Sequence, residues 1–221
     1  MSTALFQYPA QATVGSRVPK SRVYRFAKPT QAVRDLIVGQ VQEITWTYKL
    51  SAETINLPAR DGITKIQIFR MDLKQAELDE AVLRTLDKAV AFPILFELRW
   101  QGRIKPVAAY KRPSEAEAGQ QVIGGYVETG WQPAGAERAP LPLALDLSGL
   151  YTRLLRVLMP LTPRPGETLR QQAERLARIK TKEREVRQAE TRLRRERQFN
   201  HKVAINAELR GLRAELKRLL E

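Results

Sequence analysis

The chain has 221 residues, a hydrophobic fraction of 43% and a formal net charge of +14. It contains no cysteine and one histidine, which excludes disulfide bonds, thiolate-bound zinc and an imidazole-rich metal centre and is typical of a reducing compartment. The first twelve residues lack the pattern of a signal peptide, and proline and charged residues interrupt the most apolar long stretch, residues 141–161. We therefore expect a cytoplasmic protein without a membrane span.

The first half of the chain predicts a mixture of helices and strands. Pro19 fits the start of a short helix, where its missing N–H is not needed, and Thr30 fits the cap of a second helix. Apolar residues recur with helical spacing up to Ile44 and alternate after it, which indicates a change from helix to strand. The expected elements are helices over 19–26, 33–44 and 77–91, strands over 44–50 and 63–73, and a loop over 51–62.

The second half predicts more strands and one further helix before the arm. A Gln-Gly turn signal at 101–102 separates two alternating stretches, which is typical of a hairpin. The glycine pair at 124–125 indicates a bulge or a close approach of two backbones, and Asp146 or Ser148 fits a helix cap. The expected elements are strands over 94–100, 103–110 and 122–131 and a helix over 150–158. This order predicts an α+β fold with a mainly antiparallel sheet and helices packed on one face.

Composition predicts three segments: a globular domain over residues 1–160, a proline-rich boundary over 161–166 and a basic helical arm over 167–221. The arm contains no proline, and its apolar stripe is interrupted at Phe199–His201. One continuous rod about 80 Å long would need a second chain, and hence a homodimer through the arm, to cover this stripe. We favour a pair of long C-terminal helices folded as a hairpin, because the two stripes then bury one another.

The positive charge is concentrated in the arm. Residues 1–166 and 167–221 each carry a net charge of +7, although the second segment is the shorter by far. Such an excess favours a polyanionic partner, because cations that bind phosphates release counterions from nucleic acid. The alternative is that the charge only keeps a helical protein in solution. Charge alone does not decide between the two.

Sequence signatures of common catalytic sites are absent. The chain has no Gly-rich phosphate loop, no dinucleotide fingerprint and no Gly-x-Ser-x-Gly motif. Its histidine, His201, lies in the arm beside basic residues, and a solvated or capping role explains it. We therefore assign no catalytic residue, no metal site and no cofactor.

One enzymatic alternative is a metal-dependent nuclease, which needs acidic residues and a lysine on neighbouring strands to hold magnesium and activate water. Glu97 lies on an expected strand, with Asp87 upstream and Lys111 on the next strand, but arginine occupies position 99 where this chemistry needs lysine. An ion pair between Glu97 and a basic residue of its own hairpin explains the same pattern. The candidate partners are Arg99, Arg103 and Lys105.

Two clusters of basic residues are the candidates for contact with nucleic acid. The first lies near the N-terminus, where Tyr8 and Tyr24 add rings that can stack on bases. The second is the densest basic run of the arm. The eight candidate residues are Arg17, Lys20, Arg22, Arg25, Arg192, Arg194, Arg195 and Arg197. A solvated helical surface is the simpler interpretation of both clusters.

Several segments give the chain a resemblance to a known family. They are Phe6–Pro9, Val18–Lys20, Trp46–Asn56, Ile94–Leu98, Ala109–Pro113 and Gln198–Leu209. In these segments the chain resembles the bacterial family called domain of unknown function 4391. Members of that family tend to be encoded beside helicases and DNA methyltransferases in phage-defence islands. The resemblance implies an accessory subunit of a restriction-like complex and supplies no activity and no site residues.

From the charge and the resemblance together we expect a non-catalytic accessory subunit of a DNA-targeting defence complex. Its globular domain would dock a helicase or a DNA methyltransferase, and its arm would extend this contact or meet DNA without reading its sequence. The alternatives are a metal-dependent nuclease subunit and a structural dimeric adaptor that does not contact nucleic acid. No membrane partner is expected.

Overall fold

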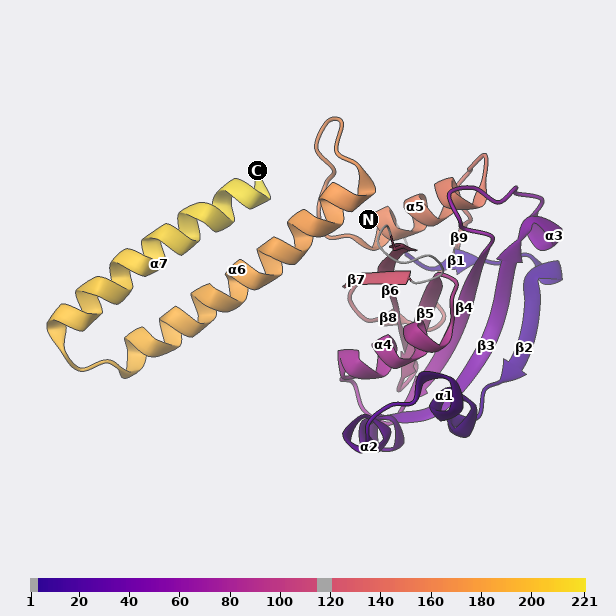
Figure 1. Ribbon diagram of the computed structural model, residues 1–221, viewed down its shortest axis with the longest axis horizontal. Helices are drawn as coiled ribbons and strands as arrows, with labels where there is room; N and C mark the ends of the chain where they lie inside the picture. The colour runs from indigo at the N-terminus through magenta and orange to yellow at the C-terminus, as the bar shows by residue number, and fades with distance from the viewer. Residues whose placement is uncertain (1–3, 115–120) are drawn as a thin grey trace. The chain divides into compact units, whose positions relative to one another are not determined.

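The computed structural model describes residues 4–114 and 121–221. The chain divides into two compact units, residues 1–160 and residues 161–221. The first unit contains a β-sheet with helices, and the second contains two long helices (Figure 1). Among the described helices, none is both long enough and apolar enough to cross a bilayer.

A mixed sheet organises the first unit, with its strands in the order β2-β3-β4-β5-β6-β7. They are β2 (Thr13–Arg17), β3 (Val41–Ser51), β4 (Lys65–Leu73), β5 (Ile94–Trp100), β6 (Arg103–Pro113) and β7 (Gln121–Glu128), and the short β8 (Gln132–Pro133) pairs with β6. Strands β4 and β5 are parallel and are joined by helix α4 (Glu80–Ala89), whereas the other neighbours in this order are antiparallel. The expected α+β fold with a mainly antiparallel sheet is confirmed.

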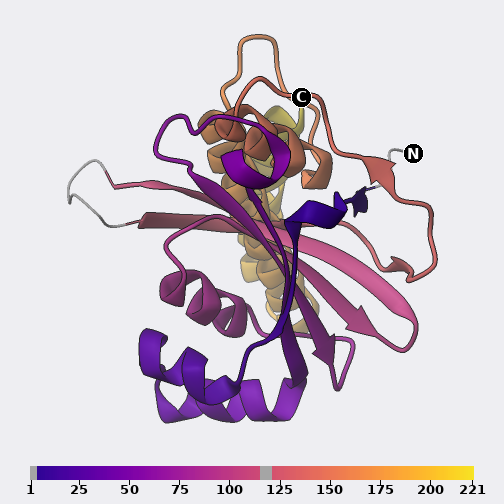
Figure 2. The same ribbon diagram turned by 90° about the vertical axis from the view of Figure 1, so that its right-hand side faces the viewer.

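Three helices cover one face of this sheet: α1 (Lys20–Ala27), α2 (Gln31–Gln40) and α4 (Figure 2). Their apolar side chains and those of the strands form one buried cluster, with Ile37 from α2, Leu86 from α4, and Met71 and Phe96 from the strands. Helix α4 forms because its apolar residues recur every three or four positions, and Asp79 caps it by accepting a hydrogen bond from the Ala81 N–H at 2.8 Å.

The opposite face of the sheet is also buried. Ile66, Ile68, Leu95 and Ala108 are at most 3% exposed, and they alternate along their strands with side chains of the first cluster. Helix α5 (Leu147–Leu158) contacts β4, β6 and β7. The expectation of helices on one face is therefore wrong, because a strand that is apolar on both sides needs a cover on both sides.

A short parallel pair, β1 (Phe6–Gln7) with β9 (Ala139–Pro140), lies outside the main sheet. A bulge in β3 between Trp46 and Tyr48 changes which face its side chains occupy. Trp46 packs on the cluster beneath the helices, whereas the Tyr48 ring lies 4.6 Å from that of Tyr8.

A second bulge lies in β7, where Gly124 and Gly125 lie opposite Tyr110, the residue of β6 between Ala109 and Lys111. Tyr151 of α5 contacts the backbone of β6 at the same place. The Tyr151 hydroxyl donates to the Ala109 carbonyl at 2.6 Å and accepts from the Lys111 N–H at 2.9 Å. Burial raises the pKa of this hydroxyl above its ordinary value. One side chain therefore satisfies two backbone groups of β6.

Gly124 of β7 is the member of the glycine pair at 124–125 that lies close to another strand. A Cβ atom at this position would lie 3.0 Å from the Tyr110 carbonyl oxygen, which is tighter than an ordinary van der Waals contact. The interpretation that this pair marks a bulge or a close approach of two backbones is confirmed, because the pair forms the bulge in β7 and Gly124 lies close to Tyr110.

Several short elements lie where the sequence predicts none. They are β2, the 3₁₀ helix η1 (Ala10–Ala12) and helix α3 (Ala52–Ile55), which lies in the expected loop. Helix α3 begins with a capping box in which Ser51 and Thr54 satisfy one another's backbone. The helix caps expected at Thr30 and Asp146 lie at those positions, and Asp146 accepts from the Gly149 N–H at 2.7 Å.

The second unit is the expected helical hairpin, built from α6 (Leu169–Arg195) and α7 (Phe199–Leu220). Its buried seam contains Leu176, Ile179, Ala189 and Leu209. Ion pairs join the two helices along their length, because the charged residues that flank the seam are of opposite sign. They are Lys182–Glu215 at 2.7 Å, Arg213–Glu190 at 2.8 Å and Arg192–Glu208 at 2.6 Å.

The C-terminal end of α7 is held by two arginines. Arg175 forms a bidentate ion pair with Glu167 at 2.7 and 2.8 Å and donates to the Leu219 carbonyl at 3.1 Å. Arg164 donates to the Arg218 carbonyl at 2.9 Å. Cations at a helix C-terminus satisfy carbonyls that have no partner within the helix. The hydrogen bonds from Arg175 hold the pKa of Glu167 at about 2.

Candidate nucleic-acid interface

The N-terminal basic candidates have separate structural environments. The Lys20 ammonium donates to the Val41 carbonyl at 2.5 Å, and Lys74 donates to the Val38 carbonyl at 2.8 Å. Both lysines therefore satisfy the C-terminal end of α2. Burial, and then the charge of Lys74, lower the pKa of Lys20. Lys20 is a structural cation of the fold.

The three neighbouring arginines also differ from one another. Arg17 pairs with Glu43 at 3.1 Å, which neutralises its charge locally. The Arg25 guanidinium lies 4.9 Å from the centre of the Phe26 ring. Arg22 lines an apolar cavity beneath α1. The first candidate cluster is thus divided among different contacts.

In the arm, the hairpin separates the four candidate arginines. Arg192 forms the interhelical ion pair with Glu208, so its charge stabilises the hairpin. Arg194, Arg195 and Arg197 are exposed, and the described residues offer no ion-pair partner to their side chains. These three remain candidates for an external anion.

Two further arginines of α6, which the sequence analysis missed, lie on the same face as Arg195. Arg184, Arg187 and Arg195 are spaced three and eight residues apart, so the helical period puts all three on one side of the helix. Arg184 and Arg187 line one shallow hollow with Thr191. All three arginines are exposed, and no ion pair to them exists within residues 4–114 and 121–221. We call them the outer stripe of α6. It rises about 16 Å, a length over which one strand of duplex DNA presents about five phosphates.

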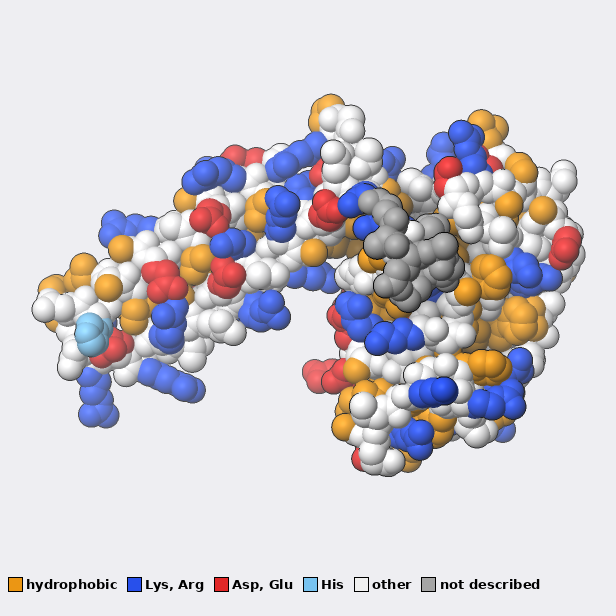
Figure 3. Space-filling view, viewed as in Figure 1, with side chains coloured by type: hydrophobic (Ala, Val, Ile, Leu, Met, Phe, Trp, Pro, Cys, Tyr) orange, Lys and Arg blue, Asp and Glu red, His pale blue; other side chains and the backbone are white. Residues whose placement is uncertain are grey.

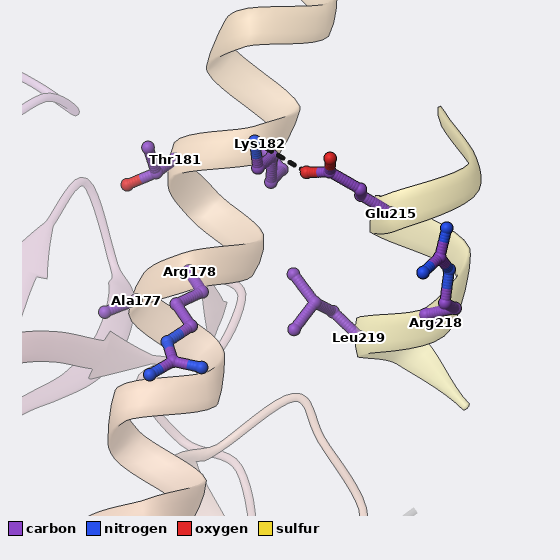
Figure 4. A pocket seen from close by; sticks show the side chains of 7 residues that line it. All are labelled: Ala177, Arg178, Thr181, Lys182, Glu215, Arg218 and Leu219. Carbon is purple, nitrogen blue, oxygen red and sulfur yellow. Dashed lines mark ion pairs between the residues drawn. The ribbon is translucent and has the colours of Figure 1, made fainter. Parts of the chain in front are cut away.

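Lys and Arg side chains are visible along the hairpin in the space-filling view (Figure 3). A groove of about 480 Å³ between α6 and α7 contains three of them, Arg178, Lys182 and Arg218. Glu215 also projects into this groove and pairs with Lys182 (Figure 4). Glu215 raises the pKa of Lys182, and Lys182 lowers the pKa of Glu215. The groove therefore carries its own counter-charge, unlike the outer stripe.

The acidic residues of the nuclease alternative lie on opposite faces of the sheet. Glu97 alternates with Phe96 and Leu98, which pack beneath the helices, so it projects to the other side from Asp87 of α4. Its carboxylate accepts two hydrogen bonds from the Arg138 guanidinium, at 2.8 and 2.9 Å.

The expected partners of Glu97, namely Arg99, Arg103 and Lys105, are wrong. Lys105 pairs with Glu128 at 3.0 Å, and the Arg103 guanidinium donates to the Trp131 carbonyl at 3.2 Å. Arg138 comes from the chain just before β9, and the fold brings it to Glu97.

Asp87 and Lys111 do lie close together, but both side chains are buried. The Lys111 ammonium lies 3.6 Å from the Asp87 carboxylate, and both side chains are 1% exposed. Lys111 also donates to the backbone carbonyls of Asp87, Val90 and Phe92. The Tyr126 hydroxyl donates to Asp87 at 2.5 Å. Burial raises the pKa of Asp87 and lowers that of Lys111.

This geometry assigns a structural role to the Asp87–Lys111 pair. Lys111 satisfies the free carbonyls at the C-terminal end of α4 and joins the helix to β6. Within the described ranges, no three Asp, Glu or His side chains are grouped so that they could hold a metal ion. His201 is exposed and lies 3.5 Å from Glu196 at the turn of the hairpin.

No curated protein and no solved structure matches the chain. Residues 6–216 match the family model described as a domain of unknown function, DUF4391. The match begins in β1 and ends within α7, so it includes elements of both units. The chain therefore belongs to the DUF4391 family.

Proposed function

We propose that this protein is a non-catalytic accessory subunit of a DNA-targeting bacterial defence complex. Its first unit docks a helicase or a DNA methyltransferase, and its helical hairpin lies along nucleic acid without reading the sequence. The nucleic-acid contact is assigned to the outer stripe of α6, extended by Arg194 and Arg197 near the turn of the hairpin.

The observation that carries the proposal is the contrast between charged residues of the hairpin that form ion pairs and the arginines of the outer stripe, which form none among the described residues. The three ion pairs named above join charged residues of α6 to residues of opposite charge on α7. Unneutralised arginines at regular spacing on a rigid helix favour a polyanion, and they bind phosphates without distinguishing bases.

The docking part of the proposal is supported by an exposed apolar segment. Leu143 and Leu145, in the loop before α5, are each 90% exposed. Exposed apolar surface is typical of a region that meets another protein, so we assign the docking contact to this loop. The family resemblance described above supports a helicase or a DNA methyltransferase as that partner.

The nucleic-acid part predicts a steep dependence of binding on salt. Replacing Arg184, Arg187 and Arg195 with glutamine should flatten the slope of log K against log salt by up to about 2.7, because each lost phosphate contact on duplex DNA contributes about 0.9. Fluorescence anisotropy with a labelled duplex of arbitrary sequence measures the slope. A duplex of scrambled sequence should give the same affinity as the first.

A matched control removes the same charge from the first unit. The variant with Arg17, Arg22 and Arg25 replaced by glutamine should keep the wild-type slope. If this control loses the slope and the arm variant keeps it, the assignment to the arm is wrong. If the wild type does not bind duplex at low salt, the nucleic-acid part fails and a structural adaptor is the better description.

A further inference from the structure

A cavity of about 340 Å³ lies in the first unit between α1, the strands β2, β3 and β4, and the turn after α4. This volume is at the lower end of the range for small-molecule sites, about 300–1,000 Å³. The residues that line it are mainly apolar, and four of these residues are aromatic: Phe26, Trp46, Phe69 and Phe92. The cavity therefore suits one flat, compact group.

The polar group on the inner wall of this cavity is the side-chain amide of Gln67. Gln67 is 8% exposed, and none of the described residues forms a hydrogen bond with its side chain. The indole N–H of Trp46 is already used, because it donates to the Tyr48 carbonyl at 3.1 Å. An amide that lines a cavity and has no partner on the protein is available to a ligand through its donor and its acceptor. A ligand that offers a donor and an acceptor side by side would satisfy it.

The cavity also has a cation at its rim. Arg22 is exposed on α1, and its guanidinium has no ion-pair partner among the described residues. No acidic residue occurs among those that line the cavity in the described part of the chain. Arginine binds phosphate through two parallel hydrogen bonds, so the rim favours an anionic group on the ligand.

The wall formed by Val90 and Phe92 is held in place from behind. Lys111 donates to the carbonyls of both residues, and the Lys65 ammonium lies 5.2 Å from the centre of the Phe92 ring. Val90 and Phe92 are therefore held in position before a ligand binds. Such preorganisation favours binding, because less conformational entropy is lost.

We propose that this cavity binds a single unstacked nucleobase that carries a phosphate. The base lies among the aromatic side chains, its polar edge pairs with the Gln67 amide, and its phosphate contacts Arg22. A glutamine amide matches the adjacent donor and acceptor of a base edge, as in the pairing of glutamine with adenine. The source of the base is a free nucleotide or an unpaired base of a nucleic-acid strand. The proposal does not depend on the outer stripe of α6.

Isothermal titration calorimetry on the full chain tests this assignment. The probes are the four 5′-mononucleotides, ribose 5-phosphate as a ligand without a base, and a short single-stranded oligonucleotide. We expect saturable one-to-one binding of at least one mononucleotide and at least about tenfold weaker binding of ribose 5-phosphate. Quenching of tryptophan fluorescence that is lost in Trp46→Phe places the ligand in the cavity.

Substitutions then separate the contacts. Gln67→Met keeps the length of the side chain and should weaken binding about tenfold or more, as should Arg22→Gln. Lys28→Gln, at an exposed cation directly after the same helix, is the matched control and should leave binding unchanged. Gln67→Glu provides a second variant at the same position, which changes the hydrogen-bonding pattern and should also weaken binding. Thermal unfolding of each variant shows whether its fold is retained.

The two sources give different results. Equal affinity for a mononucleotide and an oligonucleotide assigns the site to a free nucleotide, whereas at least tenfold tighter binding of the oligonucleotide assigns it to an unpaired base. The proposal is overturned if none of the mononucleotides binds and the oligonucleotide does not bind either, or if the ligands that bind do so equally well to wild type, Gln67→Met and Arg22→Gln. The arm variant described above should keep mononucleotide binding, so failure of one proposal is distinguishable from failure of the other.

Discussion

Replacing Lys111 with methionine should lower the free energy of unfolding of the first unit by about 3–5 kcal/mol, the usual effect of breaking a buried ion pair on one side. The substitution leaves the Asp87 carboxylate without its cation at 1% exposure, and it leaves three carbonyls at the end of α4 without their donor. Chemical denaturation followed by circular dichroism measures the change.

Two controls distinguish the ion pair from a general effect of losing a lysine. Lys88→Met, on the exposed side of the same helix, should change the free energy of unfolding by no more than about 0.5 kcal/mol. The double variant Asp87→Asn with Lys111→Met should be more stable than Lys111→Met alone, because no buried charge is left unpaired. A loss below about 1 kcal/mol in Lys111→Met would contradict the structural role of this lysine.

Replacing Arg175 with methionine should release the C-terminal end of α7. Arg175 joins Glu167, the Thr162 carbonyl and the Leu219 carbonyl, so its loss separates the start of the second unit from its end. We expect the backbone amides of the last turns of α7 to exchange with solvent about 100-fold faster, because about 3 kcal/mol of protection is lost. Hydrogen exchange followed by mass spectrometry resolves this segment.

The same contact predicts a dependence on acid. Because Glu167 has a pKa of about 2 in place of 4.5, its stabilising effect is complete above pH 4.5 and is lost as the pH falls to 2. The shift corresponds to at most about 3 kcal/mol. Glu167→Gln should be less stable than wild type at pH 7 and should lose less stability on acidification. If both proteins respond equally to acid, other carboxylates determine the effect.

Elements set by local signals could be predicted from the sequence. The turn signal at 101–102 produces the hairpin of β5 and β6, the apolar spacing after Asp79 produces α4, and Asp146 caps α5. Strand β2 was missed because its residues are mostly polar and exposed, and its conformation depends on pairing with β3 more than twenty residues later. Helix α3 did have a signal, the capping-box pair Ser51 and Thr54, inside a stretch interpreted as a loop.

For the candidate site, the sequence predicts which residues are basic but not which of them lack a partner in the fold. A basic residue is visible in sequence, but whether it is free depends on what the fold places beside it. Lys20 and Arg192 became structural through the Val41 carbonyl and Glu208. The spacing of Arg184, Arg187 and Arg195 on one helical face was readable, whereas the Arg138 partner of Glu97 lies 41 residues away and was not.

The backbone of β6 at Ala109 and Lys111 restricts which residue can occupy position 151. Its side chain must reach from α5 to the sheet and must both accept from one backbone group and donate to another. Phenylalanine has the reach but would leave the Ala109 carbonyl and the Lys111 N–H unpaired, and serine has the hydroxyl but not the reach. Tyrosine at position 151 and the backbone conformation of β6 between Ala109 and Lys111 therefore depend on one another: a member of the family that loses one should also lose the other.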